Sequence, residues 1–272
     1  LNITPDHLDR YDYQMQNYIN AKFRIIRNMT PEDAFIFWQD DPVIARQLEQ
    51  VVTEARLVPF AEHCEENTRA YVDAENELVI SADNSPLVMP RADLALNGLH
   101  NLYNAMAAGL SAKLLHVRNA DIARALSDFE GVEHRLEFVA TVDSVRWIND
   151  SKATNVNSCW YALESMPESR STVLILGGKD KGNDYSEILP LVRRKVKAIV
   201  AMGLHNEKIV DFFGSEVPVT STSSLADAVA AARSAAAPGD TVLLSPCCAS
   251  FDLFTSYEDR GRKFKDAVRA LQ

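Results

Sequence analysis

Short apolar runs alternate with amphipathic segments in the second half of the chain, and this alternation predicts its architecture. Between the runs, apolar positions recur at helical spacing. Strands that alternate with helices predict a parallel, doubly wound α/β sheet. The expected strands are 172–176, 198–202, 217–219 and 241–244, and the expected helices lie near 158–165, 185–195, 206–213, 225–236 and 257–271.

The first half shows a different pattern, in which short strands dominate. The expected helices are 12–28, 102–110 and 121–129, and the expected strands are 34–38, 51–60, 69–72, 78–81 and 86–96. After Gly131 the pattern of apolar and polar residues changes, and two apolar runs flanking Asp143-Ser144 predict a hairpin over 136–148. We therefore expect two α/β domains. Residues 1–131 carry a mixed sheet with helices, and residues 132–272 carry a Rossmann-like, doubly wound sheet.

Composition and charge exclude several classes of protein. Of the 272 residues, 47% are hydrophobic and 24% are charged, as in ordinary globular proteins. A net charge of -10 argues against a nucleic-acid-binding surface, although a local basic pocket for an anion remains compatible with it. The four cysteines include no C-x-x-C pair, which argues against a zinc cluster and favours reduced thiols. No apolar run reaches the ~18 residues of a membrane span, and no signal peptide is visible. We expect a cytoplasmic protein that binds neither nucleic acid nor membrane.

Three polar clusters follow apolar runs of the second half, where strands are expected to end. They are NDSKATN at 149–155, GGKDK at 177–181 and SPCCAS at 245–250. Each alone also fits a plain turn, with an Asn or Ser helix cap or with surface lysines. Ligands of open α/β sheets bind at the carboxyl ends of strands, so three clusters at one edge favour a binding crevice. There, Gly177 and Gly178 would let the backbone approach a ligand.

Two further clusters lie in the first half. His7 stands among carboxylates in the sequence DHLDR, as a metal ligand or as part of a solvated loop. Asn101 and Asn104 are three residues apart at a predicted helix start and share one face. Their amides either cap the helix, which is favoured for at least one of them, or contact a nucleobase edge.

Taken together, these motifs resemble the C-terminal two-thirds of the bacterial Mur ligases, over essentially the whole chain. The matching strings are TPDHLDRY at 4–11, AKFRI at 21–25, GLHNLYNAMAA at 98–108, EHR at 133–135, NDSKATN at 149–155, GGKDK at 177–181 and SPCCASFDLF at 245–254. The resemblance implies ATP- and Mg²⁺-dependent amide formation through an acyl phosphate, in peptidoglycan synthesis. NDSKATN discriminates within the family and implies that D-glutamate is added to UDP-N-acetylmuramoyl-L-alanine. We expect the parent protein to be a monomer.

The resemblance also implies roles for individual residues. His7 matches a magnesium ligand, and Lys22 matches a lysine that is carried as a carbamate and helps to hold metal. The helix-surface alternative for Lys22 stays open. Asn101 and Asn104 match positions near the adenine. Arg135 would contact phosphate, and Asp150 would contact ribose hydroxyls.

Other matched residues lie at the catalytic and amino-acid end of the site. Lys152 matches a catalytic position beside the phosphate, and Thr154 lies near it. The implied D-glutamate pocket consists of Thr154, Lys181, Ser250, the Phe251 backbone and Tyr257. Tyr257 stands where the family is expected to have Phe, so the pocket gains a hydroxyl if the contact there is made by the side chain.

One expected motif does not occur in the sequence. No G-x-x-x-x-G-K-[ST] phosphate loop occurs, and GGKDK has neither its spacing nor its hydroxyl. The family places that loop, a catalytic Glu and a UDP-binding domain before TPDHLDRY. We therefore expect a truncated central domain, with on the order of 100–200 residues preceding Leu1. Two alternatives remain open: a ligase with another substrate, such as a folylpolyglutamate synthase, and a non-catalytic nucleotide or amino-acid binding module.

The absent motif generates a prediction about catalysis. We expect residues 1–272 alone to form no amide bond, because nothing in their sequence grips the ATP phosphates. An assay of ADP release that depends on D-glutamate measures this. Measurable ligation by this chain would contradict it.

A second prediction concerns self-association. A central sheet without its first strands has an uncovered edge, and such edges pair with other chains. We expect concentration-dependent association of residues 1–272 in sedimentation velocity experiments. A single monomeric species at every concentration would count against this.

Overall fold

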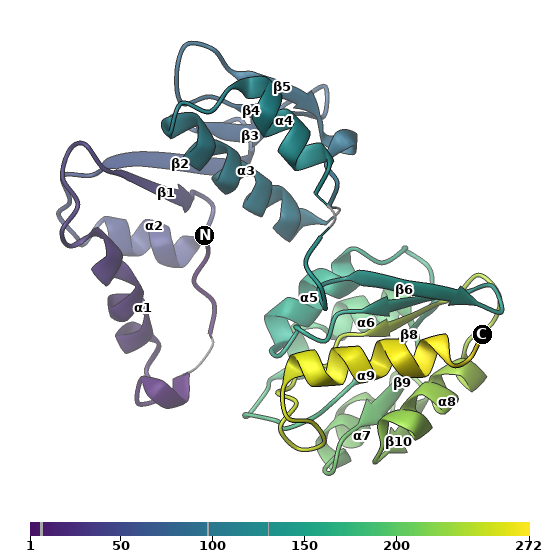
Figure 1. Cartoon of the computed structure of the whole chain (residues 1–272). Helices are drawn as coiled ribbons and strands as arrows, with labels where there is room; N and C mark the ends of the chain where they lie inside the picture. The colour runs from purple at the N-terminus through teal and green to yellow at the C-terminus, as the bar shows by residue number, and fades with distance from the viewer. Residues whose placement is uncertain (6–7, 97, 130) are drawn as a thin grey trace. The chain divides into compact units, whose positions relative to one another are not determined.

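The computed structural model describes residues 1–5, 8–96, 98–129 and 131–272. The chain divides into two compact units, Leu1–Glu130 and Gly131–Gln272 (Figure 1). Within the described ranges, no helix has the length and apolar composition needed to cross a bilayer. All four cysteines are free thiols.

The C-terminal unit is built on a six-stranded sheet of order β10-β9-β8-β11-β7-β6. All neighbouring strands are parallel except β6 and β7, which form the predicted hairpin. Asp143 and Ser144 join them with φ of 50° and 62°, the conformation that two-residue hairpin turns favour. The strands are β6 (Glu137–Val142), β7 (Val145–Asn149), β8 (Thr172–Leu176), β9 (Val196–Met202), β10 (Val219–Thr222) and β11 (Thr241–Leu244).

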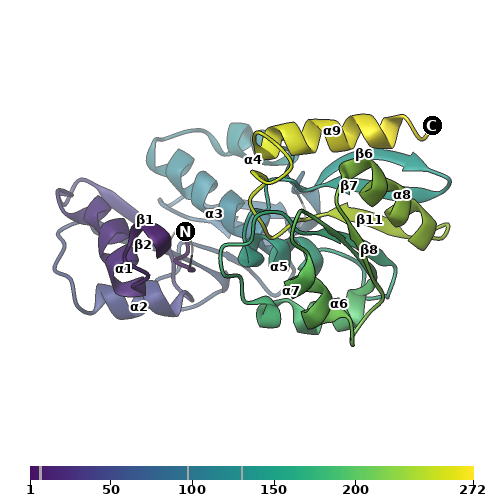
Figure 2. The ribbon, with the colours of Figure 1, turned by 90° about the horizontal axis from the view of Figure 1, so that it is seen from below.

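Helices cover both faces of this sheet (Figure 2). On one face lie α5 (Val156–Glu164), α6 (Leu189–Lys195) and α7 (Glu207–Phe213), and on the other lie α8 (Leu225–Ala235) and α9 (Tyr257–Arg269). The strand β8 is apolar throughout because its side chains serve both cores: Leu174 and Leu176 face the first layer, while Val173 and Ile175 face the second. The predicted doubly wound fold is confirmed.

The order of the strands determines where a ligand site is expected in this sheet. The strands β8 and β11 are neighbours, but the chain leaves β8 toward α6 on one face and leaves β11 toward α9 on the other. Such a divergence opens a space at the carboxyl ends of the strands. Because β7 pairs with the other side of β11, its carboxyl end borders the same space.

The N-terminal unit holds a five-stranded mixed sheet of order β1-β2-β3-β4-β5, parallel from β1 to β3 and antiparallel from β3 to β5. Its two faces are covered by different helices: Ile36 and Trp38 of β1 pack toward α3, whereas Phe37 packs toward α1. The elements are α1 (Met15–Phe23), β1 (Ala34–Trp38), α2 (Pro42–Leu48), β2 (Arg56–His63), β3 (Ala70–Val72), β4 (Glu77–Ile80), β5 (Leu87–Pro90), α3 (Leu99–Leu114) and α4 (Asn119–Ser127).

Several expected elements differ from those observed. The helix expected over 12–28 is only α1 followed by a 3₁₀ turn, and the strand expected over 86–96 ends at Pro90. The sequence analysis missed α2, although Asp41 caps it through the amides of Val43 and Ile44, and Pro42 opens it. The helix α3 begins after Gly98, so neither Asn101 nor Asn104 is its N-cap residue.

Candidate functional site

The loops after β7, β8 and β11 are joined to one another by backbone hydrogen bonds. The amide of Asp150 donates to Leu244 O at 2.8 Å, and that of Gly177 donates to Pro246 O at 2.9 Å. Lys179 N also donates to Ala249 O at 2.8 Å. The three polar clusters thus form a single structure at the strand ends, as the sequence predicted.

Arg260, on α9, makes hydrogen bonds to two of these loops. It is fully buried. Its guanidinium donates to Ser151 Oγ at 2.9 Å, to Ser151 O at 2.8 Å and to Cys248 O at 3.1 Å. Burial lowers its pKa to about 10, so it stays cationic at neutral pH. The buried charge is therefore held by oxygens of both loops.

The two glycines of GGKDK serve loop packing. Gly177 and Gly178 have φ of 128° and 130°, where L side chains are strained. A Cβ on Gly177 would lie 2.6 Å from Met202 O, and one on Gly178 would lie 2.4 Å from Ala249 O. The two glycines are therefore required by close approach to neighbouring backbone, and the expected approach to a ligand stays a prediction.

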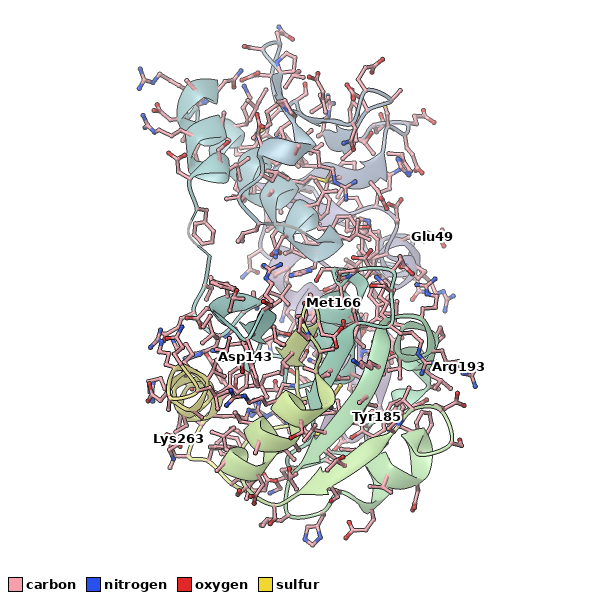
Figure 3. All side chains as sticks on the ribbon, turned by 90° about the vertical axis from the view of Figure 1, so that its right-hand side faces the viewer. Glu49, Asp143, Met166, Tyr185, Arg193 and Lys263 are labelled. Atoms are coloured by element: carbon pink, nitrogen blue, oxygen red, sulfur yellow. The ribbon has the colours of Figure 1, made fainter. Side chains whose placement is uncertain are left out.

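Asp180 organises the rest of this loop. Its carboxylate accepts from the amides of Gly182 and Asn183 at 2.6 and 2.9 Å. It also accepts from the hydroxyl of Tyr185 at 2.9 Å. Tyr185 is labelled in Figure 3 and is buried. Against the cost of partial burial, these hydrogen bonds leave the pKa of Asp180 below its usual value. Lys181, next in the chain, is exposed and pairs with no described carboxylate.

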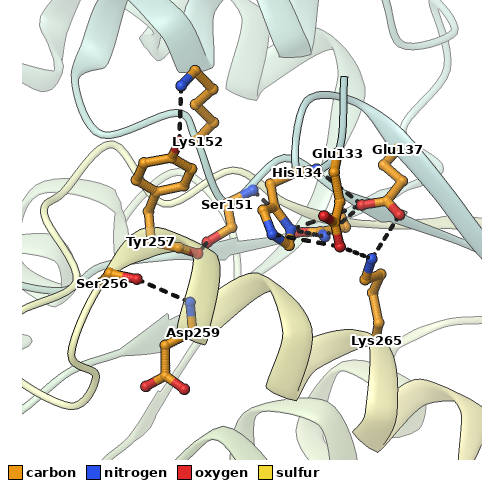
Figure 4. A network of polar contacts seen from close by, with 10 residues as sticks. Glu133, His134, Glu137, Ser151, Lys152, Ser256, Tyr257, Asp259 and Lys265 are labelled. Carbon is orange, nitrogen blue, oxygen red and sulfur yellow. Dashed lines mark hydrogen bonds and ion pairs between the residues drawn. The ribbon is translucent and has the colours of Figure 1, made fainter. Parts of the chain in front are cut away.

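Lys152 lies in the loop after β7 and contacts the first residue of α9. Its ammonium lies 3.0 Å from the Tyr257 hydroxyl and 4.6 Å from the centre of that ring (Figure 4). Ser151 Oγ donates to the backbone carbonyl of Tyr257 at 2.8 Å. Two successive residues of the loop therefore bind the same tyrosine, and Lys152 forms no ion pair within the described part of the chain.

The other residues expected in the amino-acid pocket differ in exposure. Thr154 is half-buried, and Ser250 is buried at the end of the β11 loop. The Phe251 side chain is 67% exposed. All lie in the three loops that the structure joins, and their contacts with D-glutamate stay predictions.

Asp150 and Arg135, expected to contact the nucleotide, lie in different environments. Asp150 is 5% exposed, and its two oxygens accept from Leu136 N at 3.2 Å and from Ser245 Oγ at 2.8 Å. Burial raises its pKa to about 7, although these bonds and the neighbouring Arg135 and Arg260 oppose the rise. The Arg135 side chain is exposed. The ribose contact expected of Asp150 stays a prediction.

A potential metal-ligating cluster lies at the start of this unit. Ligand atoms of Glu133, His134 and Glu137 lie within 4.8 Å of one another. However, the ammonium of Lys265 already bridges both carboxylates, at 2.9 Å from Glu137 (Figure 4). Asn149 Nδ2 donates to His134 Nδ1 at 2.9 Å, which places the imidazole proton on Nε2. Because a cation is in place and the free nitrogen carries a proton, these residues do not fit a metal ion.

The candidate residues of the N-terminal unit are less constrained. Lys22 is on the exposed side of α1, with its ammonium 5.1 Å from the centre of the Tyr18 ring. Asn101 is buried and Asn104 half-buried on the first two turns of α3. His7 lies outside the described residues.

Sequence reasoning missed Arg260 and the cluster around Lys265. Arg260 and Lys265 are charged side chains on α9, where a periodic pattern alone predicts a solvated helix face. A signal was present in Gly261, because a glycine inside a helix marks close packing. A Cβ there would lie 2.2 Å from His134 Nδ1.

The doubly wound sheet and the three loops joined at its strand ends define an open α/β fold, the class in which ligands bind at the carboxyl ends of strands. Residues 1–112 match the Mur ligase middle domain, and residues 134–248 match the Mur ligase glutamate ligase domain. The chain belongs to the Mur ligase family.

The most similar relatives carry one name. The chain is 60% identical over its whole length to UDP-N-acetylmuramoylalanine–D-glutamate ligase of Bacteroides fragilis and covers 61% of that protein. It is 53% identical, again over its whole length, to the protein of the same name from Porphyromonas gingivalis and covers 60% of it. The chain thus spans about three-fifths of the length of these relatives.

Solved structures support the same fold. A pseudomurein peptide ligase type C from Methanothermus fervidus matches with a TM-score of 0.72 at 17% identity, over 100% of this chain and 62% of that one. A MurF ligase from Thermotoga maritima in complex with ADP matches with a TM-score of 0.67 at 13% identity, with the same coverage. Both cover the two units of this chain.

The raised pKa of Asp150 generates a prediction about stability. Because the folded protein binds this proton more tightly than the unfolded chain, its contribution is complete below about pH 4 and is lost as pH rises through about 7. Relative to Asp150→Asn, the wild type should lose up to about 4 kcal/mol of unfolding free energy between pH 4 and pH 8. Urea unfolding of both proteins at each pH measures this. An equal difference at both pH values would refute it.

Proposed function

We propose that this chain supplies the ATP- and amino-acid-binding parts of a ligase that joins D-glutamate to UDP-N-acetylmuramoyl-L-alanine. The observation that carries the proposal is the meeting of NDSKATN, GGKDK and SPCCAS at one edge of the sheet, with the ammonium groups of Lys152 and Lys181 unpaired by any described carboxylate. Unneutralised cations at strand ends suit anionic substrates. The names of the most similar relatives support the same reaction.

The chemistry requires two successive transfers. The muramoyl-alanine carboxylate attacks the γ-phosphorus of ATP, so that an acyl phosphate forms and ADP leaves. The amine of D-glutamate then attacks the acyl carbon, loses a proton, and expels phosphate as the amide forms. Both steps need charge stabilisation and fixed orientation more than a reactive protein group.

The residues of the C-terminal unit suit the second step. Lys181 would neutralise a carboxylate of D-glutamate, and Ser250, the Phe251 backbone and Thr154 would complete its pocket. Lys152 would stabilise the phosphate that is formed and later released. Arg135 would contact the nucleotide phosphates. This unit would therefore orient the amine toward the acyl carbon.

The N-terminal unit would bind the base and the metal. Asn101 and Asn104 would lie near the adenine. Mg²⁺, which would neutralise phosphate charge when bound, would be held by His7 and by Lys22 as its carbamate. Among the described residues only Lys22 bears on that fit. Its exposure leaves it accessible to CO₂, but an ammonium is no ligand, so no step here depends on the ion. We place the whole reaction in the cytoplasm.

A matched pair of lysines tests the proposal. Lys179 and Lys181 lie in the same loop, and both are exposed without an ion pair to a described residue. We expect Lys181→Met to weaken D-glutamate binding about tenfold, because a charge-assisted bond to a carboxylate is lost. Lys179→Met should change it less than about threefold.

Calorimetry on the chain, with L-glutamate and meso-diaminopimelate as competitors, measures this effect. D-glutamate should bind more tightly than either. Equal effects of the two substitutions, or no preference for D-glutamate, would argue for a different substrate.

A further inference from the structure

The phenol of Tyr257 is held in place from several directions. Its backbone carbonyl accepts from Ser151 Oγ, and that hydroxyl in turn accepts from the buried Arg260 Nε at 2.9 Å. Tyr257 is the first residue of α9, which Ser256 caps through the amide of Asp259 at 3.2 Å. The buried His134 ring lies near the Tyr257 ring, with their centroids 6.2 Å apart and their planes at 85°. The backbone that carries the Tyr257 ring is therefore held in place by several contacts.

Lys152, by contrast, is a flexible side chain with one recorded polar partner. Its ammonium donates to the Tyr257 hydroxyl at 3.0 Å and lies 4.6 Å from the ring centre. A lysine ammonium has three donors, so two remain for a ligand. Because no described carboxylate pairs with Lys152, its charge is also available to an anion.

The Tyr257 hydroxyl has one described donor, the Lys152 ammonium at 3.0 Å. A hydroxyl oxygen has two lone pairs and its proton rotates to suit its partners, so the oxygen can accept from the ammonium while the proton turns away. The hydroxyl is thus a defined acceptor for Lys152.

We propose that Tyr257 is a positioning residue for Lys152: its hydroxyl holds the ammonium at the crevice so that the remaining N–H groups meet an incoming oxyanion. This inference rests on the proposed function for the identity of that oxyanion, a phosphate or carboxylate group of the substrates. A phenylalanine in the same place would keep the ring contact and lose the fixed acceptor. A pre-oriented donor loses less side-chain freedom on binding, and this is the gain that we assign to the hydroxyl.

The first test needs no ligand. In lysine NMR spectra of the chain, the Lys152 ammonium should exchange more slowly and be more ordered than that of the unpaired Lys181. Tyr257→Phe should abolish the difference, whereas Tyr13→Phe, at an exposed tyrosine of the other unit, should not. A Lys152 signal as mobile as that of Lys181 in the wild type would overturn the proposal, whatever the chain binds.

The second test is a double-mutant cycle on binding. We expect Tyr257→Phe to weaken the binding of one oxyanion about fivefold, as loss of one hydrogen bond implies. Lys152→Met should weaken it more, and the double variant should be no worse than Lys152→Met, because the tyrosine acts through the lysine.

Inorganic phosphate and D-glutamate are titrated separately to identify the oxyanion. Additive effects would show that the tyrosine acts independently and would refute positioning. If phosphate binding shows the expected non-additive result and D-glutamate does not bind, the positioning role stands and the proposed amino-acid substrate is refuted. Unchanged urea midpoints for Tyr257→Phe exclude a folding effect.

Discussion

The buried guanidinium of Arg260 is the interaction on which the arrangement of the loops at the strand ends depends. Its donors reach Ser151 in the loop after β7 and Cys248 in the loop after β11, and its own helix carries Tyr257. Removing a charge from water is costly. The three hydrogen bonds offset part of that cost, and the nearby acidic groups Asp252 and Asp150 offset a further part through their charge. Since each acceptor left unpaired would cost about 1–3 kcal/mol, the loops and α9 are energetically coupled.

This coupling explains how polar residues on distant segments act together. Ser151 accepts from Arg260 and donates to Tyr257, and Tyr257 accepts from Lys152. A buried, rigid set of contacts thus ends in a half-exposed ammonium. Asp180 has the corresponding effect in the loop after β8, where it orders the turn beside the exposed Lys181. In both loops the cation is at least partly exposed, while the neighbouring residues are held by hydrogen bonds.

The sequence predicted the sheet, the two-unit organisation and the clustering of polar loops, because these follow from local patterns and from the order of elements. It could not predict which polar residues are buried. Asp150 and Lys152 are two residues apart and both polar, yet one is enclosed with a raised pKa and the other reaches solvent. That difference depends on Ser245 and Leu136, which lie far away in the chain. The short helix α2 was hidden for another reason: its capping signal is local, but seven residues show too little periodicity.

The position of β11 has a consequence for the order of assembly. It lies between β7 and β8, although it follows β8 in the chain by more than sixty residues. The two earlier strands have no direct pairing, so the centre of the sheet stays open until β11 inserts. Contacts so distant in sequence close slowly, because loop entropy must be overcome first. During synthesis, the nascent chain therefore cannot form the crevice before β11 and α9 have emerged from the ribosome.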